Sequence, residues 1–289
     1  MGVLDTIRYI VRHPLAGKHP VRSLVDWARW QLGSRLVPGP IVVPFVDATQ
    51  LVVARGNSAA LGNVYCGLHE PEDMAFVLHF LTADDLFADV GANVGSYTVL
   101  AAGAVGARAH AFEPVPITFR ALETNVRHNR LEGRVTLHRT GVGAEAAELV
   151  MTSDADAGNR ILRPGESAPD TVRVQVRRLD DLLAGEVPAL VKIDVEGFEQ
   201  EVLAGAPATL ASPALRAIII EVWTRHDEVA RALAERGFTA IDYDPLTRTA
   251  SARGAVQRAR PNTIFVRDVA EAQARVRAAR RFQIKSVEI

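Results

Sequence analysis

Apolar residues recur at helical spacing in two segments near the start of the chain, Leu4–Val11 and Val21–Leu36. Pro14, Gly17 and Pro20 lie between them, and these residue types interrupt helices because proline lacks an N–H group and glycine is conformationally free. The pattern therefore predicts two amphipathic helices separated by a short turn.

The second of these segments also carries basic and aromatic residues, Arg22, Arg29, Arg35, Trp27 and Trp30. One interpretation is a basic-aromatic surface that binds a membrane or a partner protein. The alternative, which we favour, is a helical cap packed on the main domain.

Two short apolar runs follow, Ile41–Val46 and Gln50–Arg55, with the polar residues 47–49 between them. Two apolar runs joined by so short a polar segment are typical of a β-hairpin. After the hairpin, apolar residues in Glu72–Leu81 return mostly to helical spacing and predict a helix.

From residue 86 onward, short apolar runs alternate with segments of helical spacing. The predicted strands are Leu86–Val90, Arg108–Phe112, Val135–Arg139, Leu190–Val195, Ala217–Val222, Phe238–Tyr243 and Thr263–Arg267. The predicted helices between them are Tyr97–Val105, Ile117–Asn129, Phe198 to about Leu210, and Asp227–Arg236. This alternation predicts a Rossmann-like α/β domain, whose mostly parallel sheet carries helices on both faces.

The alternation is interrupted at about residues 148–180. This stretch holds two strand-like segments, Glu148–Thr152 and Val172–Leu179, and a loop between them rich in Asp, Gly and Pro. We interpret it as an insertion that faces the substrate, because loops on a rigid scaffold often carry binding residues. The expected organisation is an N-terminal helical and hairpin extension (1–60), a core (61–270), and a C-terminal helix and tail (271–289).

Composition narrows the classes of function. The chain has 289 residues, 48% of them hydrophobic, a net charge of −1 and a pI near 6.7, so it lacks the basic excess typical of nucleic-acid binders. Cys66 is the single cysteine and cannot form an internal disulfide. No apolar run reaches the ~18 residues that a membrane span needs. We expect a cytoplasmic protein without a transmembrane segment, which could form a homo-oligomer.

The strongest chemical signal follows the first strand of the core, where residues 89–95 read Asp-Val-Gly-Ala-Asn-Val-Gly. Gly91 and Gly95 allow a sharp turn and a close approach of a ligand. Asp89 offers a carboxylate to an ammonium group or a hydroxyl. Glu113 ends the next strand, where its carboxylate can accept hydrogen bonds from both hydroxyls of a ribose. Together these residues predict a ligand that contains a nucleoside.

Two classes of ligand compete for this loop. A dinucleotide enzyme needs the spacing Gly-x-Gly-x-x-Gly, which places backbone N–H groups on a pyrophosphate. The loop here lacks that spacing, and Asp89 would repel a pyrophosphate but attract the cationic methionine part of S-adenosylmethionine. We therefore favour a methyltransferase over an NAD-type oxidoreductase, and a non-catalytic domain that binds the cofactor remains a third hypothesis.

Three further carboxylates follow neighbouring strands of the core. Asp194 and Glu196 end one predicted strand, and Glu221 ends the next. Because parallel strands deliver their carboxyl ends to one edge of the sheet, these groups should crowd a single cleft. Burying them without compensation is costly, so we expect a cation, a proton or a ligand among them. They are candidates for a catalytic base or for a magnesium site.

These motifs and their order resemble those of FkbM-type methyltransferases. The resemblance covers about residues 65–267 and rests on residues 89–95, Phe112-Glu113-Pro114, residues 179–182, residues 192–199, residues 202–206, Ile220-Glu221 and residues 262–265. It implies a class I methyltransferase fold with a seven-stranded sheet whose last strand is antiparallel. It also implies S-adenosylmethionine as methyl donor, and O-methylation of a sugar, a polyketide or another secondary metabolite. The acceptor is thus expected to be a small molecule or a glycan.

The resemblance also assigns candidate roles to individual residues. The methionine part of the donor would be held by Asp89, Gly91, Asn93 and Gly95, and the ribose by Glu113. Asp194 would lie beside the amino group or the transferred methyl group. The full set of candidate cofactor-binding residues is Asp89, Gly91, Ala92, Asn93, Gly95, Ser96, Glu113, Pro114 and Asp194.

Other polar residues are weaker candidates. Asn159 lies in the insertion and resembles an asparagine that the family often keeps near the substrate. Lys192 could approach a reacting hydroxyl. His69 and His226 could act as bases, although a surface histidine that begins a helix is the more ordinary interpretation of His226.

Overall fold

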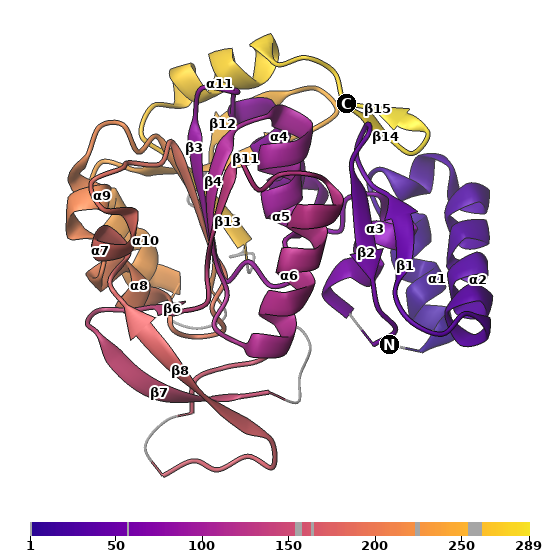
Figure 1. Ribbon diagram of the computed structural model, residues 1–289. Helices are drawn as coiled ribbons and strands as arrows, with labels where there is room; N and C mark the ends of the chain where they lie inside the picture. The colour runs from indigo at the N-terminus through magenta and orange to yellow at the C-terminus, as the bar shows by residue number, and fades with distance from the viewer. Residues whose placement is uncertain (1, 57, 154–157, 163–164, 223–225, 254–261) are drawn as a thin grey trace.

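A central sheet of eight strands organises the protein (Figure 1). The structure is a computed structural model that describes residues 2–56, 58–153, 158–162, 165–222, 226–253 and 262–289. Along the sheet the strand order is β12-β11-β13-β10-β9-β3-β4-β5. The bounds of these strands are β3 Leu86–Val90, β4 Arg108–Phe112, β5 Val135–His138, β9 Leu190–Ile193, β10 Ala217–Glu221, β11 Thr239–Asp244, β12 Thr249–Ala252 and β13 Asn262–Val266.

The direction of the strands matches the class I methyltransferase fold. β5, β4, β3, β9 and β10 pair in parallel, whereas β13 pairs antiparallel with both β10 and β11. The predicted seven-stranded sheet with an antiparallel last strand is thereby confirmed. The eighth strand, β12, pairs antiparallel with β11 at the edge, and the sequence did not predict it because Ala250 is its single buried residue.

Helices cover both faces of the sheet, as predicted (Figure 1). On one side lie α4 Pro71–Phe80, α5 Ser96–Val99 with its π-helical continuation Leu100–Val105, and α6 Pro116–His128. On the other lie α7 Leu179–Leu183, α8 Glu199–Ala204, α9 Pro207–Ala211 and α10 His226–Ala234. Successive residues of β10 alternate between the two cores, since Ile219 packs in one cluster and Ile218 and Ile220 in the other. This alternation is the two-residue period of a strand buried on both faces.

Several predicted elements end earlier than the sequence pattern suggested, and two of them show the physical reason. The helix predicted from Phe198 to about Leu210 is two helices, α8 and α9, because Pro207 has no N–H to continue the first and instead begins the second. The strand predicted at Val172–Leu179 ends at Arg177, since Leu179 begins α7 and packs in the second core.

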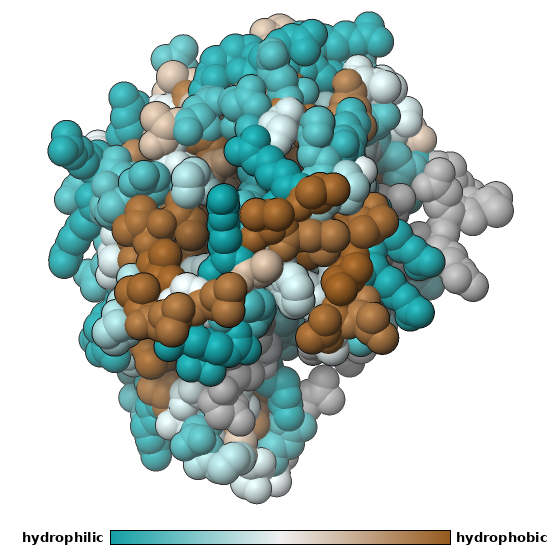
Figure 2. Space-filling view, turned by 90° about the vertical axis from the view of Figure 1, so that its right-hand side faces the viewer, coloured by the Kyte–Doolittle hydropathy of each residue, from teal (hydrophilic) through white to brown (hydrophobic). Residues whose placement is uncertain are grey.

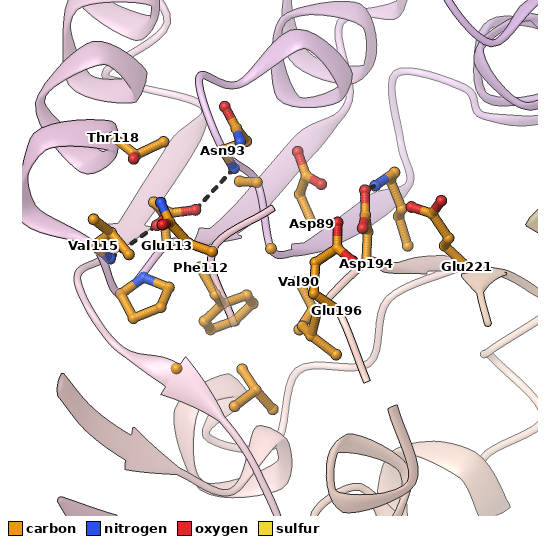
Figure 3. A pocket seen from close by; sticks show the side chains of 18 of the residues that line it. Asp89, Val90, Asn93, Phe112, Glu113, Val115, Thr118, Asp194, Glu196 and Glu221 are labelled. Atoms are coloured by element: carbon orange, nitrogen blue, oxygen red, sulfur yellow. Dashed lines mark hydrogen bonds and ion pairs between the residues drawn. The ribbon is translucent and has the colours of Figure 1, made fainter. Parts of the chain in front are cut away.

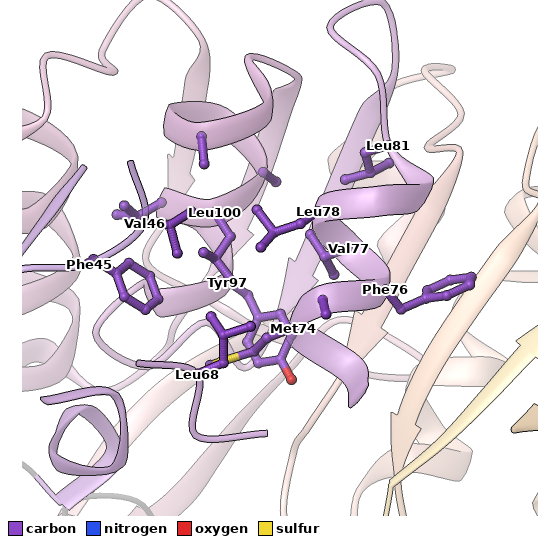
Figure 4. Close-up of a cluster of buried hydrophobic side chains, with 14 of the residues drawn as sticks. Phe45, Val46, Leu68, Met74, Phe76, Val77, Leu78, Leu81, Tyr97 and Leu100 are labelled. Atoms are coloured by element: carbon purple, nitrogen blue, oxygen red, sulfur yellow. The ribbon is translucent and has the colours of Figure 1, made fainter. Parts of the chain in front are cut away.

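The N-terminal residues fold as the predicted two helices and hairpin, followed by a third helix that the sequence did not predict. The elements are α1 Val3–Arg12, the 3₁₀ turn Ala16–Lys18, α2 Pro20–Leu36, the antiparallel pair β1 Ile41–Pro44 and β2 Gln50–Val53, and α3 Ser58–Cys66. Buried residues of this region, among them Ile10, Trp30 and Phe45, belong to the same apolar cluster as Met74 and Leu100 of the core. Figure 4 shows part of that cluster. The extension thus shares a hydrophobic core with the main domain, and its boundary at residue 60 stays a proposal.

The end of the chain returns to the N-terminal region. The last elements are α11 Val269–Ala278 and the small antiparallel pair β14 Gln283–Ile284 and β15 Val287–Glu288. Ile284 forms an isolated bridge with Val46, and Lys285 donates to Asp26 at 2.6 Å. None of the helices in the described part of the chain is both long and apolar enough to cross a membrane.

The insertion forms a small sheet of its own below the main sheet (Figure 1). Its three strands are β6 Gly141–Val142, β7 Ala147–Thr152 and β8 Thr171–Arg177, in the order β6-β8-β7. A third apolar cluster joins this sheet to the core through Val115 and Phe198. This packing places the inner side of the small sheet against the carboxyl ends of the main strands.

Candidate active site

A cavity of about 270 Å³ lies at the carboxyl ends of β3, β4, β9 and β10. Its walls include Asp89, Glu113, Asp194, Glu196 and Glu221 (Figure 3). The structure therefore brings together the carboxylates that follow four separate strands. It also places Gly91, Ala92, Asn93, Ser96 and Pro114 on the walls of the same cavity.

The loop after β3 is folded by left-handed backbone conformations. Gly91 and Gly95 have φ of 80° and 87°, and Asn93 has φ of 50°, a region that glycine and asparagine tolerate best. A Cβ atom on Gly91 would lie 1.8 Å from the carbonyl oxygen of Asp194. The glycine is thus needed because the end of β9 passes directly against the loop.

The Glu113 carboxylate is fixed by two backbone donors. The N–H of Val115 donates to Oε1 at 2.8 Å, and the N–H of Asn93 donates to Oε2 at 3.1 Å. Glu113 is 6% exposed, and burial raises its pKa to about 7 although both donors oppose this shift. A carboxylate has about four acceptor positions, so two are left that suit a pair of vicinal hydroxyls.

Asp89 has one oxygen with a partner and one without. Its Oδ2 accepts a hydrogen bond from the Thr98 hydroxyl at 2.6 Å, whereas Oδ1 is buried and has no hydrogen-bond partner in the protein. Burial raises the pKa of Asp89, and the nearby Lys192 ammonium opposes the increase. A buried acceptor on a cavity wall without a donor is costly, and an ammonium or hydroxyl group of a ligand would satisfy it.

Lys192 compensates the charge of the carboxylates. Its Nζ lies 2.7 Å from Oδ2 of Asp194 and 4.7 Å from the centre of the Tyr97 ring. Burial alone would lower the pKa of Lys192, but the charges of Asp194, Glu70 and Asp89 raise it overall, so the side chain is an ammonium. The cation expected among the carboxylates is therefore this lysine, whose position sequence reasoning left open.

Asp194 and Glu221 differ in their affinity for a proton. Burial would raise the pKa of Asp194, but the Lys192 ammonium and a hydrogen bond from Glu221 hold it below its usual value. Burial and the charge of Asp194 raise the pKa of Glu221 to about 9. At neutral pH Asp194 is ionised and Glu221 is protonated, and this proton is the second compensation that a crowded acidic cluster requires.

Glu196 occupies a different environment at the edge of the cavity. It adopts φ of 50°, and Gly197 after it has φ of 96°, so the chain turns sharply where β9 ends. Glu196 also lines a second cavity, next to Phe198. Burial and the charges of Asp194 and Glu199 raise the pKa of Glu196. A partly exposed carboxylate with a raised pKa is suited to accept a proton.

A polar network borders the cavity beside Lys192. The Tyr97 hydroxyl donates to Oε2 of Glu70 at 2.7 Å. The side-chain amide of Asn262 donates to Oε1 of Glu70 at 2.7 Å and to Asp73 at 2.8 Å. These contacts tie α4, α5 and β13 together, which fixes the ring on which the lysine ammonium rests.

The small sheet supplies a wall of which sequence reasoning had named one residue, Asn159, and otherwise only the region. Asn159 lines the cavity, as do the apolar side chains of Met151, Ile161 and Val176. Residues after β5 also line it, namely Thr140, Gly141 and Val142. The sequence signal for these residues was weak, because short apolar stretches in an insertion do not reveal which side they face.

The two histidine candidates differ in position. His69 lines the cavity, and its Nδ1 lies 2.7 Å from the hydroxyl of Tyr9. His226 begins α10 and is not among the residues that line the cavity. Among the described residues, no group of three or more His, Cys, Asp or Glu side chains is placed to hold a metal ion. The ammonium group of Lys192 lies beside Asp194, in the place where a metal ion would have to balance the charge of this carboxylate.

Comparison with known proteins identifies the family. The model of the Methyltransferase FkbM domain matches residues 89–240, a segment that runs from the β3 carboxylate to β11 and contains the acidic residues of the site. The chain belongs to the FkbM family of S-adenosylmethionine-dependent methyltransferases, as the resemblance of its motifs implied.

Two relatives similar in sequence agree with this assignment. The 31-O-demethyl-FK506 methyltransferase FkbM of Streptomyces tacrolimicus is 34% identical over 207 residues, which cover 57% of this chain and 77% of that protein. The hexuronic acid methyltransferase AglP of Haloferax volcanii is 30% identical over 171 residues, which cover 57% of this chain and 68% of that protein. The solved structure of P. horikoshii TYW2 in complex with MeSAdo matches with a TM-score of 0.42 and 15% identity, over 80% of this chain and 70% of that one.

Proposed function

We propose that this chain is an O-methyltransferase that methylates a hydroxyl group of a sugar, a polyketide or another secondary metabolite. The observation that carries the proposal is Asp89 on the cavity wall, whose buried Oδ1 has no hydrogen-bond donor in the protein. An acidic acceptor there fits the ammonium group of a methionine part and disfavours a pyrophosphate. This preference argues against the NAD-type alternative.

The donor would be held by residues of β3, β4 and the loop between β3 and α5. Asp89 would accept from its ammonium group, and Glu113 would accept from the ribose hydroxyls. When bound, the donor supplies a methyl group on a sulfonium, which is an electrophilic carbon. The glycines of the loop would let its backbone approach the ligand, and Ser96 and Pro114 would complete the walls.

The acceptor hydroxyl needs help from a base, because an alcohol is a weak nucleophile at neutral pH. Glu221 is protonated at neutral pH and Asp194 is engaged by Lys192. Glu196 is therefore the preferred base: its carboxylate would take the hydroxyl proton while the acceptor oxygen forms the new bond to the methyl carbon. Asp194 would orient the reacting groups, and Glu221 would hold Asp194 in place.

This assignment favours a base over magnesium for the acidic cluster. The ammonium of Lys192 and the proton of Glu221 already compensate Asp194. The hydroxyl as acceptor is supported by the names of the relatives, a 31-O-demethyl-FK506 methyltransferase and a hexuronic acid methyltransferase. Most of the rate gain should come from alignment of donor and acceptor, which is worth up to ~7–11 kcal/mol.

The proposal can be tested by transfer of a tritium label from the methyl group of S-adenosylmethionine to a panel of sugars and polyketide alcohols. Glu196→Gln should lower the turnover by about 100-fold or more, the usual contribution of a general base, and leave S-adenosylhomocysteine affinity largely unchanged. Glu235→Gln, at an exposed site that does not line the cavity, is the control and should leave turnover unchanged. Transfer to an amine or thiol but to no alcohol would refute O-methylation.

A further inference from the structure

Exposed apolar side chains are concentrated near the start of the chain. Among the described residues, eleven large apolar side chains are exposed, and nine of them lie between residues 3 and 42. The nine are Val3, Leu4, Val11, Val21, Val25, Leu32, Leu36, Val37 and Val42. Figure 2 shows this face of the molecule, with hydrophobic side chains gathered in patches between hydrophilic ones. We call these nine residues the apolar face.

The apolar face follows one side of each helix. On α2, Val21, Val25, Leu32 and Leu36 are spaced by four, seven and four residues, which places them on one side of the helix. Trp30, which is 6% exposed, belongs to the side that packs on the core. The helix therefore carries apolar residues on two sides, one against the core and one toward solvent.

This arrangement resolves the two interpretations of the N-terminal helices. The inner side is a helical cap on the core, as we favoured, and it uses both tryptophans, since Trp30 is buried and Trp27 packs against the same cluster. The outer side is not aromatic but aliphatic. Large contiguous apolar patches on a protein surface usually mark a site of interaction.

Basic side chains accompany the apolar face. Arg8, Arg12, Lys18, Arg22, Arg29 and Arg35 are all exposed. Residues 1–44 contain these six basic residues and two acidic ones, which gives the segment a net charge of +4. The net charge of the whole chain is −1, so the net charge of the remaining residues is −5. Of the two acidic residues, Asp26 is paired with Lys285 at 2.6 Å. The segment that carries most of the exposed apolar residues therefore has a net positive charge, whereas the rest of the chain has a net negative charge.

We propose that the apolar face and its arginines dock the protein onto the surface of an anionic phospholipid bilayer. Aliphatic side chains can enter the boundary between headgroups and acyl chains, while arginines at their edge bind the lipid phosphates. The helices lie in the plane of the interface and do not cross it, in agreement with their length and composition. A second copy of this chain is less suited to cover the apolar face, because a symmetric contact would bring together two segments that each have a net charge of +4.

The experiment is cosedimentation of the full chain with two kinds of vesicle, phosphatidylcholine alone and an equal mixture of phosphatidylcholine and phosphatidylglycerol. Binding to the mixed vesicles is expected, with little binding to phosphatidylcholine, and it should weaken as salt is raised. Arg12→Glu combined with Arg29→Glu should lower the partition coefficient at least about tenfold. The matched control, Arg231→Glu with Arg277→Glu on α10 and α11, changes the same charge at exposed sites on other helices and should leave binding intact.

A second pair of variants tests the aliphatic contribution. Val25→Ser with Leu32→Ser should weaken binding to the mixed vesicles, whereas Ile117→Ser with Leu246→Ser, which alters the two exposed apolar residues elsewhere, should not. Thermal unfolding followed by circular dichroism verifies that each variant is folded. Failure of the natural protein to bind anionic vesicles would overturn the proposal. Equal losses of vesicle binding in the two pairs of variants would also overturn it. A third contrary result would be a dimer of the natural protein that binds no vesicles and that Val25→Ser with Leu32→Ser dissociates.

Discussion

The Nζ of Lys192 lies 2.7 Å from Oδ2 of Asp194, two residues further along the same chain segment, and above the ring of Tyr97. The pairing of β3 with β9 sets Lys192 directly beside Asp89. One ammonium group therefore lies beside both Asp89, which we propose binds the cofactor, and Asp194, which we propose orients the reacting groups. Three of the predictions below concern how this charge balance is maintained.

Replacement of Lys192 by methionine should destabilise the fold. The side chain is 4% exposed, and its loss would leave Asp194 ionised in the interior without its partner. Breaking a buried ion pair from one side typically costs about 3–5 kcal/mol, which denaturant unfolding can measure. Lys18→Met, at an exposed lysine, is the control and should change stability by less than about 0.5 kcal/mol. Equal effects of the two substitutions would contradict a compensating role for Lys192.

Cofactor affinity should depend on pH through Glu113. Burial raises the pKa of this carboxyl from 4.5 to about 7. Between these two pH values the carboxyl is protonated in the folded protein but ionised in the unfolded chain. The stability that this proton confers on the fold is therefore lost as pH rises through about 7. The ionised form is the better acceptor for ribose hydroxyls. Affinity for S-adenosylhomocysteine should therefore increase from about pH 6 to pH 8 and then level off. In Glu113→Gln this increase should disappear, and its persistence would assign the titration to another group such as Asp89.

The proton on Glu221 should be required for activity at high pH. Because the pKa of Glu221 is raised to about 9, its carboxyl ionises above that pH and adds a second negative charge beside Asp194. Turnover should fall there in the natural protein. Glu221→Gln keeps a neutral donor toward Asp194 and should retain turnover beyond the pH at which the natural enzyme declines. A pH–rate profile that is the same in both proteins would show that Glu221 does not hold Asp194 in place.

Chelation should leave activity unchanged. Lys192 and the proton of Glu221 compensate the acidic cluster, so the proposed proton transfer to Glu196 needs no divalent cation. Methyl transfer should be equal, within error, in the presence of a chelator and of added magnesium. Loss of activity with the chelator and its return with magnesium would support the other role that the sequence allowed for Asp194, Glu196 and Glu221.

The strands and the cofactor loop were predictable because their signals are local. A strand buried on both faces is mostly apolar, as in β3 and β10, and the glycines of the loop are required by its backbone conformation. The antiparallel β12 was not predictable, since one buried alanine gives no apolar pattern. The break between α8 and α9 could have been predicted from Pro207. The helical spacing of the apolar residues instead predicted one helix.

The sequence predicted that the charges of the clustered carboxylates are compensated, but not which group compensates them. Sequence reasoning required some compensation for three clustered carboxylates, but it could not choose between a metal, a proton and a lysine. That choice depends on the register between β3 and β9, which sets Lys192 opposite Asp89, and on the Tyr97 ring supplied by α5. The cavity walls from the small sheet depend likewise on packing that is distant in the chain.

The central claim is that the cavity binds S-adenosylmethionine through Asp89, the loop that follows it and Glu113. Its most direct test is a calorimetric titration of S-adenosylhomocysteine into the natural protein and into Glu113→Ala, repeated in the presence of NAD. We predict a dissociation constant in the micromolar range or tighter, about −8 kcal/mol or better, a loss of roughly 1.5–3 kcal/mol in the variant, and no competition by NAD. Binding of NAD without binding of S-adenosylhomocysteine would contradict the account.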